Sequence, residues 1–274
     1  MLLKLLFIFI MAVQLSAVER IIALSPAANE MIFALGEGDK VVGNTSYCNT
    51  PKEARSVTKV GGYFSPSLEK IVTLSPDLVI MQDNNPPLTQ KLIQLGIKTI
   101  VIKIDTIDSI KKAFFTIAKP LHAEAKAAVI TKKIDKSLMG LRGIVQHKKI
   151  LIVIGSPTDL SKEIYVAGQN LYFDDIIQAS GNVNALQSSR KGQPVLNLEK
   201  ILKTNPDIVI VLAPLMKERH LTREMILSPW RDLPINAVKT HSVFIQEGDY
   251  AGIPSDRIVL FIDDFGKILR ESKH

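Results

Sequence analysis

The stretch LEKIVTLSPDLVI at residues 68–80 returns as LEKILKTNPDIVI at residues 198–210. The two copies start 130 positions apart, and eight of their thirteen positions are identical. Solenoid proteins repeat every 20–50 residues, roughly, so this distance does not fit a solenoid. A unit used twice at such a distance predicts two similar lobes. A cleft between two lobes is a common place for a small ligand.

Each copy has the pattern of a helix, a turn and a buried strand. Ser67 and Asn197 stand just before the copies, where a polar side chain can cap a helix. Pro76 and Pro206 then end the helices. The apolar runs that follow are rich in β-branched residues and do not alternate, which is typical of parallel sheets covered on both faces. We therefore predict the α/β class, with two similar lobes and largely parallel sheets.

The remaining sequence divides around one long helical segment. Strands alternate with helices over residues 18–119 and again over 148–274, which we predict to be the N-terminal and C-terminal lobes. Between them, residues 120–147 have apolar positions at helical spacing. A helix of that length spans about 40 Å. We expect it to join the two lobes, with the ligand cleft between them.

The first residues have the pattern of a secretory signal peptide. Residues 1–17 contain Lys4, then an apolar run to Val13, and a small residue, Ala17, at the expected cleavage point. A membrane anchor is the alternative, but the run is shorter than the roughly 20 apolar residues that a spanning helix needs. Cys48 is the only cysteine, so no internal disulfide forms and no lipid anchor is expected at the cleavage point.

Composition and motifs argue against several classes of function. Without residues 1–17 the net charge falls from +7 to +6, because one of 34 basic residues is lost against 27 acidic ones. The basic residues are dispersed, so we expect no nucleic-acid partner. No phosphate-binding or nucleophile motif is present, and the five histidines lack metal-ligand spacing. We expect no enzyme activity, cofactor or metal site; an exported α/β enzyme and a binder of a free metal ion are the alternatives.

Candidate binding residues stand in loops, where binding groups concentrate. They are large aromatic or cationic side chains: Tyr47, Tyr63 and Phe64 in the first lobe, and Tyr165, Tyr250 and Arg257 in the second. Packing at a lobe edge is the alternative for each aromatic. Glu69 and Glu199 fall in the first turn of the two repeated helices, where they complement the helix dipole. The helix dipole explains each Glu separately, but it explains less well why both lobes have a Glu at the equivalent position.

Five segments together resemble the periplasmic solute-binding proteins of bacterial ABC importers for cobalamin, ferric siderophores and haem. They are RIIALSPAANEMIFALG, VGGYFSPSLEKIVTLSPDLVI, GQNLYFDDIIQASGNVNA, NLEKILKTNPDIVIV and SPWRDLPINAVK, and the resemblance covers residues 20–270. It implies a monomeric periplasmic protein with two lobes on one long helix, limited hinge closure, and a metal chelate held in the cleft. It also implies that Glu69 and Glu199 dock onto arginines of the membrane permease.

The resemblance leaves the ligand open among cobalamin, a ferric siderophore and haem, with cobalamin as the first expectation. Tyr47 and Tyr63 match positions where cobalamin binders place aromatics against the corrin, but Gln193 stands where they have Trp. Haem binders use a Tyr near Tyr63 as iron ligand, at a spacing that is one residue longer. Siderophore binders use Arg or Tyr in the second lobe, for which Arg257 and Tyr250 are candidates.

Overall fold

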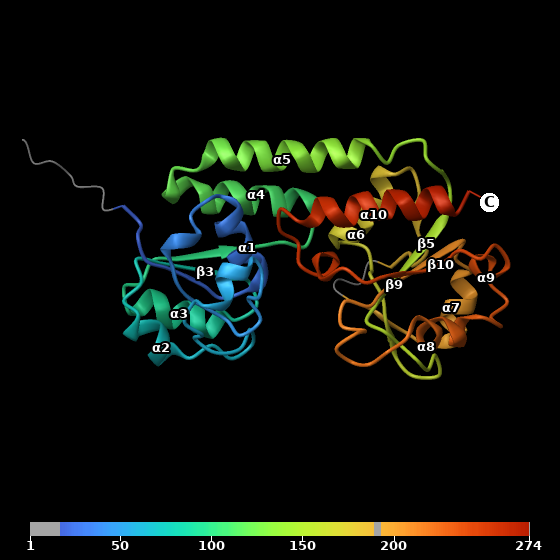
Figure 1. Cartoon of the computed structure of the whole chain (residues 1–274), viewed down its shortest axis with the longest axis horizontal. Helices are drawn as coiled ribbons and strands as arrows, with labels where there is room; N and C mark the ends of the chain where they lie inside the picture. The colour runs from blue at the N-terminus through green and yellow to red at the C-terminus, as the bar shows by residue number, and fades with distance from the viewer. Residues whose placement is uncertain (1–16, 189–192, 274) are drawn as a thin grey trace, which may run out of the picture.

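The structure is a computed structural model that describes residues 17–188 and 193–273. Two α/β lobes lie side by side and are bridged along one edge by helix α5 (Glu124–Met139), as Figure 1 shows. The predicted fold class and the two similar lobes are confirmed. Residues 1–16 lie outside the described part, so the signal peptide stays a prediction. In the described part, no helix is long and apolar enough to cross a membrane.

The N-terminal lobe is a four-stranded parallel sheet in the order β2-β1-β3-β4. The strands are β1 (Ile21–Ala23), β2 (Val41–Asn44), β3 (Leu78–Gln82) and β4 (Thr99–Ile102). Helices α1 (Pro26–Ala34) and α4 (Ile107–Ala118) cover one face, and α2 (Leu68–Thr73) and α3 (Pro86–Gln94) cover the other. Buried side chains on both faces explain why the strands read as continuous apolar runs.

The C-terminal lobe repeats this plan with a parallel sheet in the order β10-β9-β5-β7. Its strands are β5 (Lys149–Ile154), β7 (Val183–Asn184), β9 (Ile208–Leu212) and β10 (Val243–Gln246). Helices α6 (Tyr172–Ala179) and α10 (Ile258–Glu271) pack on one face, and α7 (Leu198–Thr204), α8 (Arg223–Leu227) and α9 (Asn236–Lys239) on the other. A small antiparallel pair, β6 (Ile164–Tyr165) with β8 (Val195–Leu196), lies beside this sheet.

The repeated unit has the same hydrogen bonds in both lobes. Ser67 and Asn197 accept bonds from the backbone N–H groups of Lys70 (3.3 Å) and Lys200 (3.0 Å), so both predicted caps are confirmed. The repeated aspartates face the first strand of each lobe. Asp77 accepts from the N–H groups of Glu19 and Arg20, both at 2.9 Å. Asp207 accepts from Lys149, also at 2.9 Å. The Pro-Asp pair of the repeat therefore ties each unit to the strand that opens its lobe.

The connecting helix is shorter than predicted. Residues 120–147 were expected to be helical, but α5 has 16 residues, about 24 Å. His122, with φ of +55°, separates α4 from α5. Gly140 ends α5, and Gly143, with φ of +75°, turns the chain back toward the second lobe. The helix still joins the lobes, because it packs on α4 at one end and on α10 at the other (Figure 1).

The two lobes share a core on the α5 side. One buried apolar cluster runs from Ile21 and Leu78 of the first sheet through α4, α5, α6 and α10 to Ile150 and Ile208 of the second. Polar contacts reinforce it: Asp175 of α6 accepts a 2.7 Å bond from the backbone N–H of Ile107 at the start of α4. Continuous packing on this side therefore ties the two lobes together.

Candidate ligand-binding cleft

Several hollows lie between the lobes; a small one of about 230 Å³ is lined by Glu30 and Arg257, and two larger ones are described below. The first, here called the aromatic hollow, has a volume of about 460 Å³. It receives residues from both lobes, as the predicted cleft requires. The lining residues are Pro26, Ala27, Tyr47, Tyr63, Phe64, Gln82 and Ile104 of the first lobe and Gln193, Gly252, Ile253 and Pro254 of the second. None of these described residues is charged, and three of the six predicted binding residues are among them.

The first-lobe residues of this hollow follow the carboxyl ends of parallel strands. Pro26 and Ala27 come after β1, Tyr47 after β2, Gln82 ends β3 and Ile104 follows β4. Ligands of open α/β sheets bind at that edge, because the loops there converge. The Tyr47 side chain is 62 % exposed and Phe64 is 80 % exposed. Large aromatics left open to solvent in one concave region indicate a binding surface for a flat apolar ligand.

Tyr63 is fixed at the back of the aromatic wall. Its ring packs edge-on against Phe64, with ring centroids 4.6 Å apart. Its hydroxyl donates a hydrogen bond to the side-chain oxygen of Gln82. Partial burial raises the pKa of the Tyr63 hydroxyl, so the group stays a neutral phenol near pH 7. The turn that carries it needs Gly61, since φ is +124° and a Cβ there would lie 2.9 Å from the Ser65 carbonyl.

A buried polar network positions the loop that carries Tyr47. Lys59 reaches in and donates to the Asn44 side chain (2.7 Å) and to the carbonyls of Ala54 (2.9 Å) and Cys48 (3.2 Å). Asn44 in turn donates to Asn29 at 3.0 Å. Burial lowers the pKa of Lys59. Sequence reasoning missed these residues, because nothing in an isolated Asn or Lys signals that it braces a loop.

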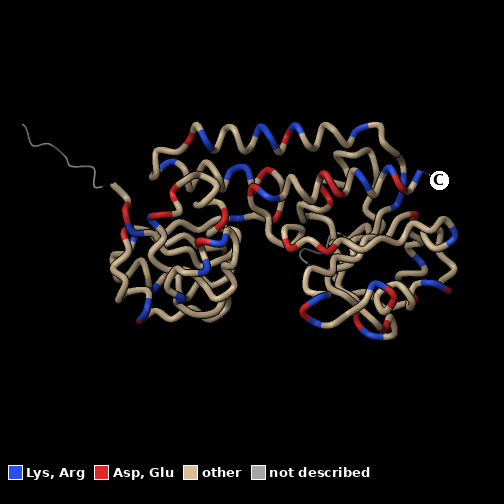
Figure 2. Tube along the Cα trace, in the orientation of Figure 1, with Lys and Arg blue, Asp and Glu red and all other residues tan. Residues whose placement is uncertain are grey.

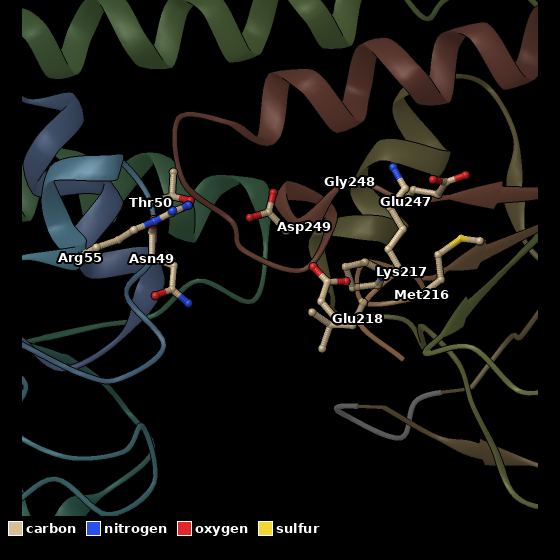
Figure 3. Close-up of a pocket in the computed structure, with 11 residues that line it drawn as sticks. Asn49, Thr50, Arg55, Met216, Lys217, Glu218, Glu247, Gly248 and Asp249 are labelled. Carbon is tan, nitrogen blue, oxygen red and sulfur yellow. The ribbon is translucent and has the colours of Figure 1, made fainter. Parts of the chain in front are cut away.

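The second hollow, here called the polar hollow, is about 670 Å³ and lies between the same two lobes. Figure 3 shows Asn49, Thr50 and Arg55 on the first-lobe wall and the acidic residues on the second-lobe wall. The second-lobe residues are Pro214, Leu215, Met216, Lys217, Glu218, Glu247, Gly248 and Asp249. Sequence reasoning missed this hollow entirely, since its residues belong to two turns, 214–218 and 247–249, without a recognisable motif.

Arg257, which the sequence analysis expected at the ligand, contacts two carboxylates in the structure. Its guanidinium forms two hydrogen bonds to Glu30 of α1, at 2.6 and 2.9 Å, and a third to Asp249 at 2.8 Å. Ser255 also donates to Glu30, at 2.5 Å. Glu30 is only 4 % exposed, so this is a buried ion pair between the lobes. Arg257 lines neither of the two larger hollows, because its guanidinium is committed to these two carboxylates.

Tyr250 and Tyr165 are likewise not among the lining residues of either larger hollow. The Tyr250 hydroxyl donates to Asp264 of α10 at 2.5 Å, and its ring packs against the shared core. Tyr165 was expected in a loop but lies in β6, where it pairs with Val195 and is 48 % exposed. We therefore leave Tyr165, Tyr250 and Arg257 out of the ligand site described below.

Glu69 and Glu199 occupy equivalent exposed places in the first turns of α2 and α7. Within residues 17–188 and 193–273, neither forms an ion pair. Both helices cover the sheet faces that point away from α5 (Figure 1). The two carboxylates are thus presented by both lobes at once. Figure 2 shows the other charges interspersed along the lobes and the bridging helices, the dispersed pattern expected from the sequence.

No cluster of three or more His, Cys, Asp or Glu side chains that could hold a metal ion occurs in the part of the chain that the structure describes. Cys48 is buried next to Thr45, with its sulfur 3.3 Å from the Thr45 hydroxyl, and burial raises the pKa of its thiol. It is therefore a poor nucleophile.

Comparisons with known proteins agree with this architecture. A vitamin B12-binding protein of Vibrio vulnificus is 25 % identical over 262 residues, covering 95 % of this chain and 93 % of its own. The crystal structure of the periplasmic vitamin B12-binding protein BtuF of Vibrio cholerae superposes with a TM-score of 0.77 at 23 % identity, over 94 % of this chain and 98 % of that one. The crystal structure of the periplasmic haem-binding protein HutB of Vibrio cholerae superposes with a TM-score of 0.76 at 23 % identity. The superposition covers 91 % of this chain and 98 % of that one.

Similarity at this level to both B12 and haem binders establishes the fold and does not select the ligand. The sequence model of one family matches residues 21–250, which is most of the chain and includes both lobes and the bridging helix. The chain belongs to the periplasmic binding protein family.

Proposed function

We propose that this protein is the substrate-binding component of an ABC importer, and that it captures a corrinoid such as cobalamin and delivers it to a membrane permease. The observation that carries the ligand is the aromatic hollow. It offers Tyr47, Tyr63 and Phe64 as an apolar wall and has no charged group among its described lining residues. A corrin ring is a large, nearly flat surface that such a wall can cover.

Haem fits this hollow less well. Haem carries two carboxylates, and its ferric iron favours an anionic oxygen ligand such as a tyrosinate. The described tyrosines of the wall are Tyr47 and Tyr63, and the Tyr63 hydroxyl is hydrogen-bonded to Gln82, with a pKa that burial raises. No described lining residue supplies a cation that would lower that pKa or pair with a carboxylate. The Tyr63 phenol therefore favours a ligand that needs no iron bond from the protein.

A ferric siderophore is the second candidate, because the polar hollow contains Arg55 and Lys217, which can attract an anionic chelate. Two cations facing three carboxylates make that attraction weak.

Binding is tested by titrating cyanocobalamin into the protein in a calorimeter. We expect one site per chain, a Tyr63→Ala variant weaker by about 1–3 kcal/mol, and a Tyr63→Phe variant close to wild type, since the ring and not the hydroxyl contacts the ligand. A normal melting temperature for both variants is the control. Equal affinity of Tyr63→Ala and wild type would remove Tyr63 from the site.

Delivery to a permease is proposed to rest on Glu69 and Glu199, which both lobes present in equivalent exposed turns. Changing both to Lys should abolish uptake and leave ligand affinity unchanged, because neither residue lines a hollow. A matched control is Glu124→Lys with Glu271→Lys, which changes the net charge equally on the α5 and α10 side. Uptake at the wild-type level by the Glu69→Lys and Glu199→Lys double variant would refute the docking role.

A further inference from the structure

The polar hollow has opposite charges on its two walls. Arg55 is the only charged residue on the first-lobe wall. The second-lobe wall carries three carboxylates, Glu218, Glu247 and Asp249, and one amine, Lys217. Figure 3 shows the Glu218 and Asp249 side chains directed toward the first-lobe wall, where Arg55 and Asn49 lie. The polar hollow therefore has a hydrogen-bonding and charge pattern that differs from that of the uncharged aromatic hollow between the same two lobes.

Some of these charges already have partners and others do not. Glu247 pairs with Arg223 at 2.7 Å, and Asp249 shares Arg257 with the buried Glu30. The Arg55 Nε donates to the Asn49 carbonyl at 2.9 Å, which leaves its two terminal nitrogens facing the hollow. Arg55, Lys217 and Glu218 form no ion pair with any residue in the ranges 17–188 and 193–273. Strong donors and strong acceptors thus remain for a ligand.

The charges of the hollow nearly cancel. The pair of Glu247 with Arg223 is neutral, and the group of Glu30, Arg257 and Asp249 holds one excess negative charge. With Glu218 that makes two negative charges, which balance those of Arg55 and Lys217. The hollow is therefore not an anion trap. A carboxylate entering it gains from Arg55 but meets Glu218 and Asp249 on the opposite wall.

A primary carboxamide matches this pattern, because its oxygen accepts from a guanidinium and its NH₂ group donates to a carboxylate. We propose that the polar hollow selects ligands with an uncharged, carboxamide-bearing periphery over ligands with carboxylates, and that Arg55 and Glu218 on opposite walls make this selection. This proposal rests on the proposed corrinoid function. It adds the kind of peripheral group, an uncharged carboxamide, that the polar hollow accepts on the ligand.

The test compares cyanocobalamin with its monocarboxylic acids, in which one peripheral carboxamide has been hydrolysed to an acid. We expect at least one of these acids to bind about three- to tenfold more weakly than cyanocobalamin at low salt. The effect is modest because Glu218 and Asp249 are partly in water, and it should shrink as salt rises.

Single substitutions of Glu218 and Arg55 test whether these two residues cause the preference for a carboxamide over a carboxylate. Glu218→Gln removes the charge that repels a carboxylate and keeps a polar group, so it should reduce the preference to less than about twofold. Arg55→Gln should weaken cyanocobalamin itself. The matched control, Glu271→Gln at the end of α10, removes the same charge far from the cleft and should keep the wild-type preference.

The outcomes separate this proposal from the proposed function. If wild type binds cyanocobalamin but binds every acid equally well or more tightly, the selection proposed here is wrong and the corrinoid function stands. A preference that survives unchanged in Glu218→Gln also overturns it. If wild type binds neither cyanocobalamin nor any of the acids, the corrinoid function is wrong, and this inference falls with it.

Discussion

Replacing Arg257 with Met tests the assignment of this residue to an interlobe ion pair. Glu30 is 4 % exposed and accepts two guanidinium hydrogen bonds, at 2.6 and 2.9 Å. Without Arg257, Glu30 keeps only the bond from Ser255. Breaking a buried pair from one side costs about 3–5 kcal/mol, and the half-exposed Asp249 adds little. At about 2–4 °C per kcal/mol, we expect the melting temperature to fall by roughly 6–20 °C.

The pH dependence of this loss identifies Glu30 as its source. Burial raises the pKa of Glu30 in the folded protein, and the hydrogen bonds from Arg257 oppose that rise. In the Met variant the opposition is gone, so the folded-state pKa rises further above the unfolded value. The folded variant then binds a proton that the unfolded chain has released, and its stability falls as pH rises through that pKa. The difference from wild type should therefore be larger at pH 8 than at pH 5.

The matched control is Arg231→Met, which removes an equally well-formed but exposed pair with Glu224, at 2.8 Å. That variant should change stability by less than about 1 kcal/mol at either pH. Thermal unfolding monitored by circular dichroism measures both variants. If Arg257→Met melts no lower than Arg231→Met, the buried interlobe pair contributes nothing, and the reasoning from burial fails.

Three further predictions concern the loops around the cleft and the chain terminus. Lys59→Met removes the three hydrogen bonds that hold the Tyr47 loop in place, so cyanocobalamin should bind at least about threefold more weakly. Unchanged affinity by calorimetry would show that the loop keeps its conformation without Lys59. Gly248→Ala places a Cβ 2.2 Å from the Tyr250 ring and should lower the melting temperature by displacing that ring from Asp264. The control is Gly252→Ala, also at negative φ, where a Cβ would meet only the Asp249 carbonyl at 3.9 Å; equal melting temperatures of the two variants would contradict the clash. Expression of the full chain should give a periplasmic protein that begins near Val18, and N-terminal sequencing that finds Met1 on a cytosolic protein contradicts export.

The repeat and the strand pattern were sufficient to predict the fold. A segment used twice with its caps and its Pro-Asp pair intact requires the same local structure twice, and local signals of this kind do not depend on distant residues. The helix boundary was harder to predict. From the sequence alone, Gly140 and Gly143 fit either a helix or a turn. Gly143 adopts a positive φ where the chain turns toward β5, which is a matter of tertiary structure.

Of the six predicted binding residues, three line the aromatic hollow and three do not. Tyr47, Tyr63 and Phe64 were predicted as aromatics in first-lobe loops, and all three line the aromatic hollow. The ion pair of Arg257 with Glu30 was not foreseen, because the two residues are 227 positions apart and give no local signal.

The polar hollow was missed for the same reason. Arg55 and Glu218 face each other only after the two lobes are placed side by side, and no periodicity in the sequence encodes that placement.

The most direct test of the account is a side-by-side absorption titration of the purified protein with cyanocobalamin and with haemin. An uncharged aromatic wall with a neutral Tyr63 phenol predicts saturable one-to-one binding of cyanocobalamin and no tyrosinate-type haem spectrum at equal concentrations. A tight haemin complex with such a spectrum, together with no binding of cyanocobalamin, would contradict the account.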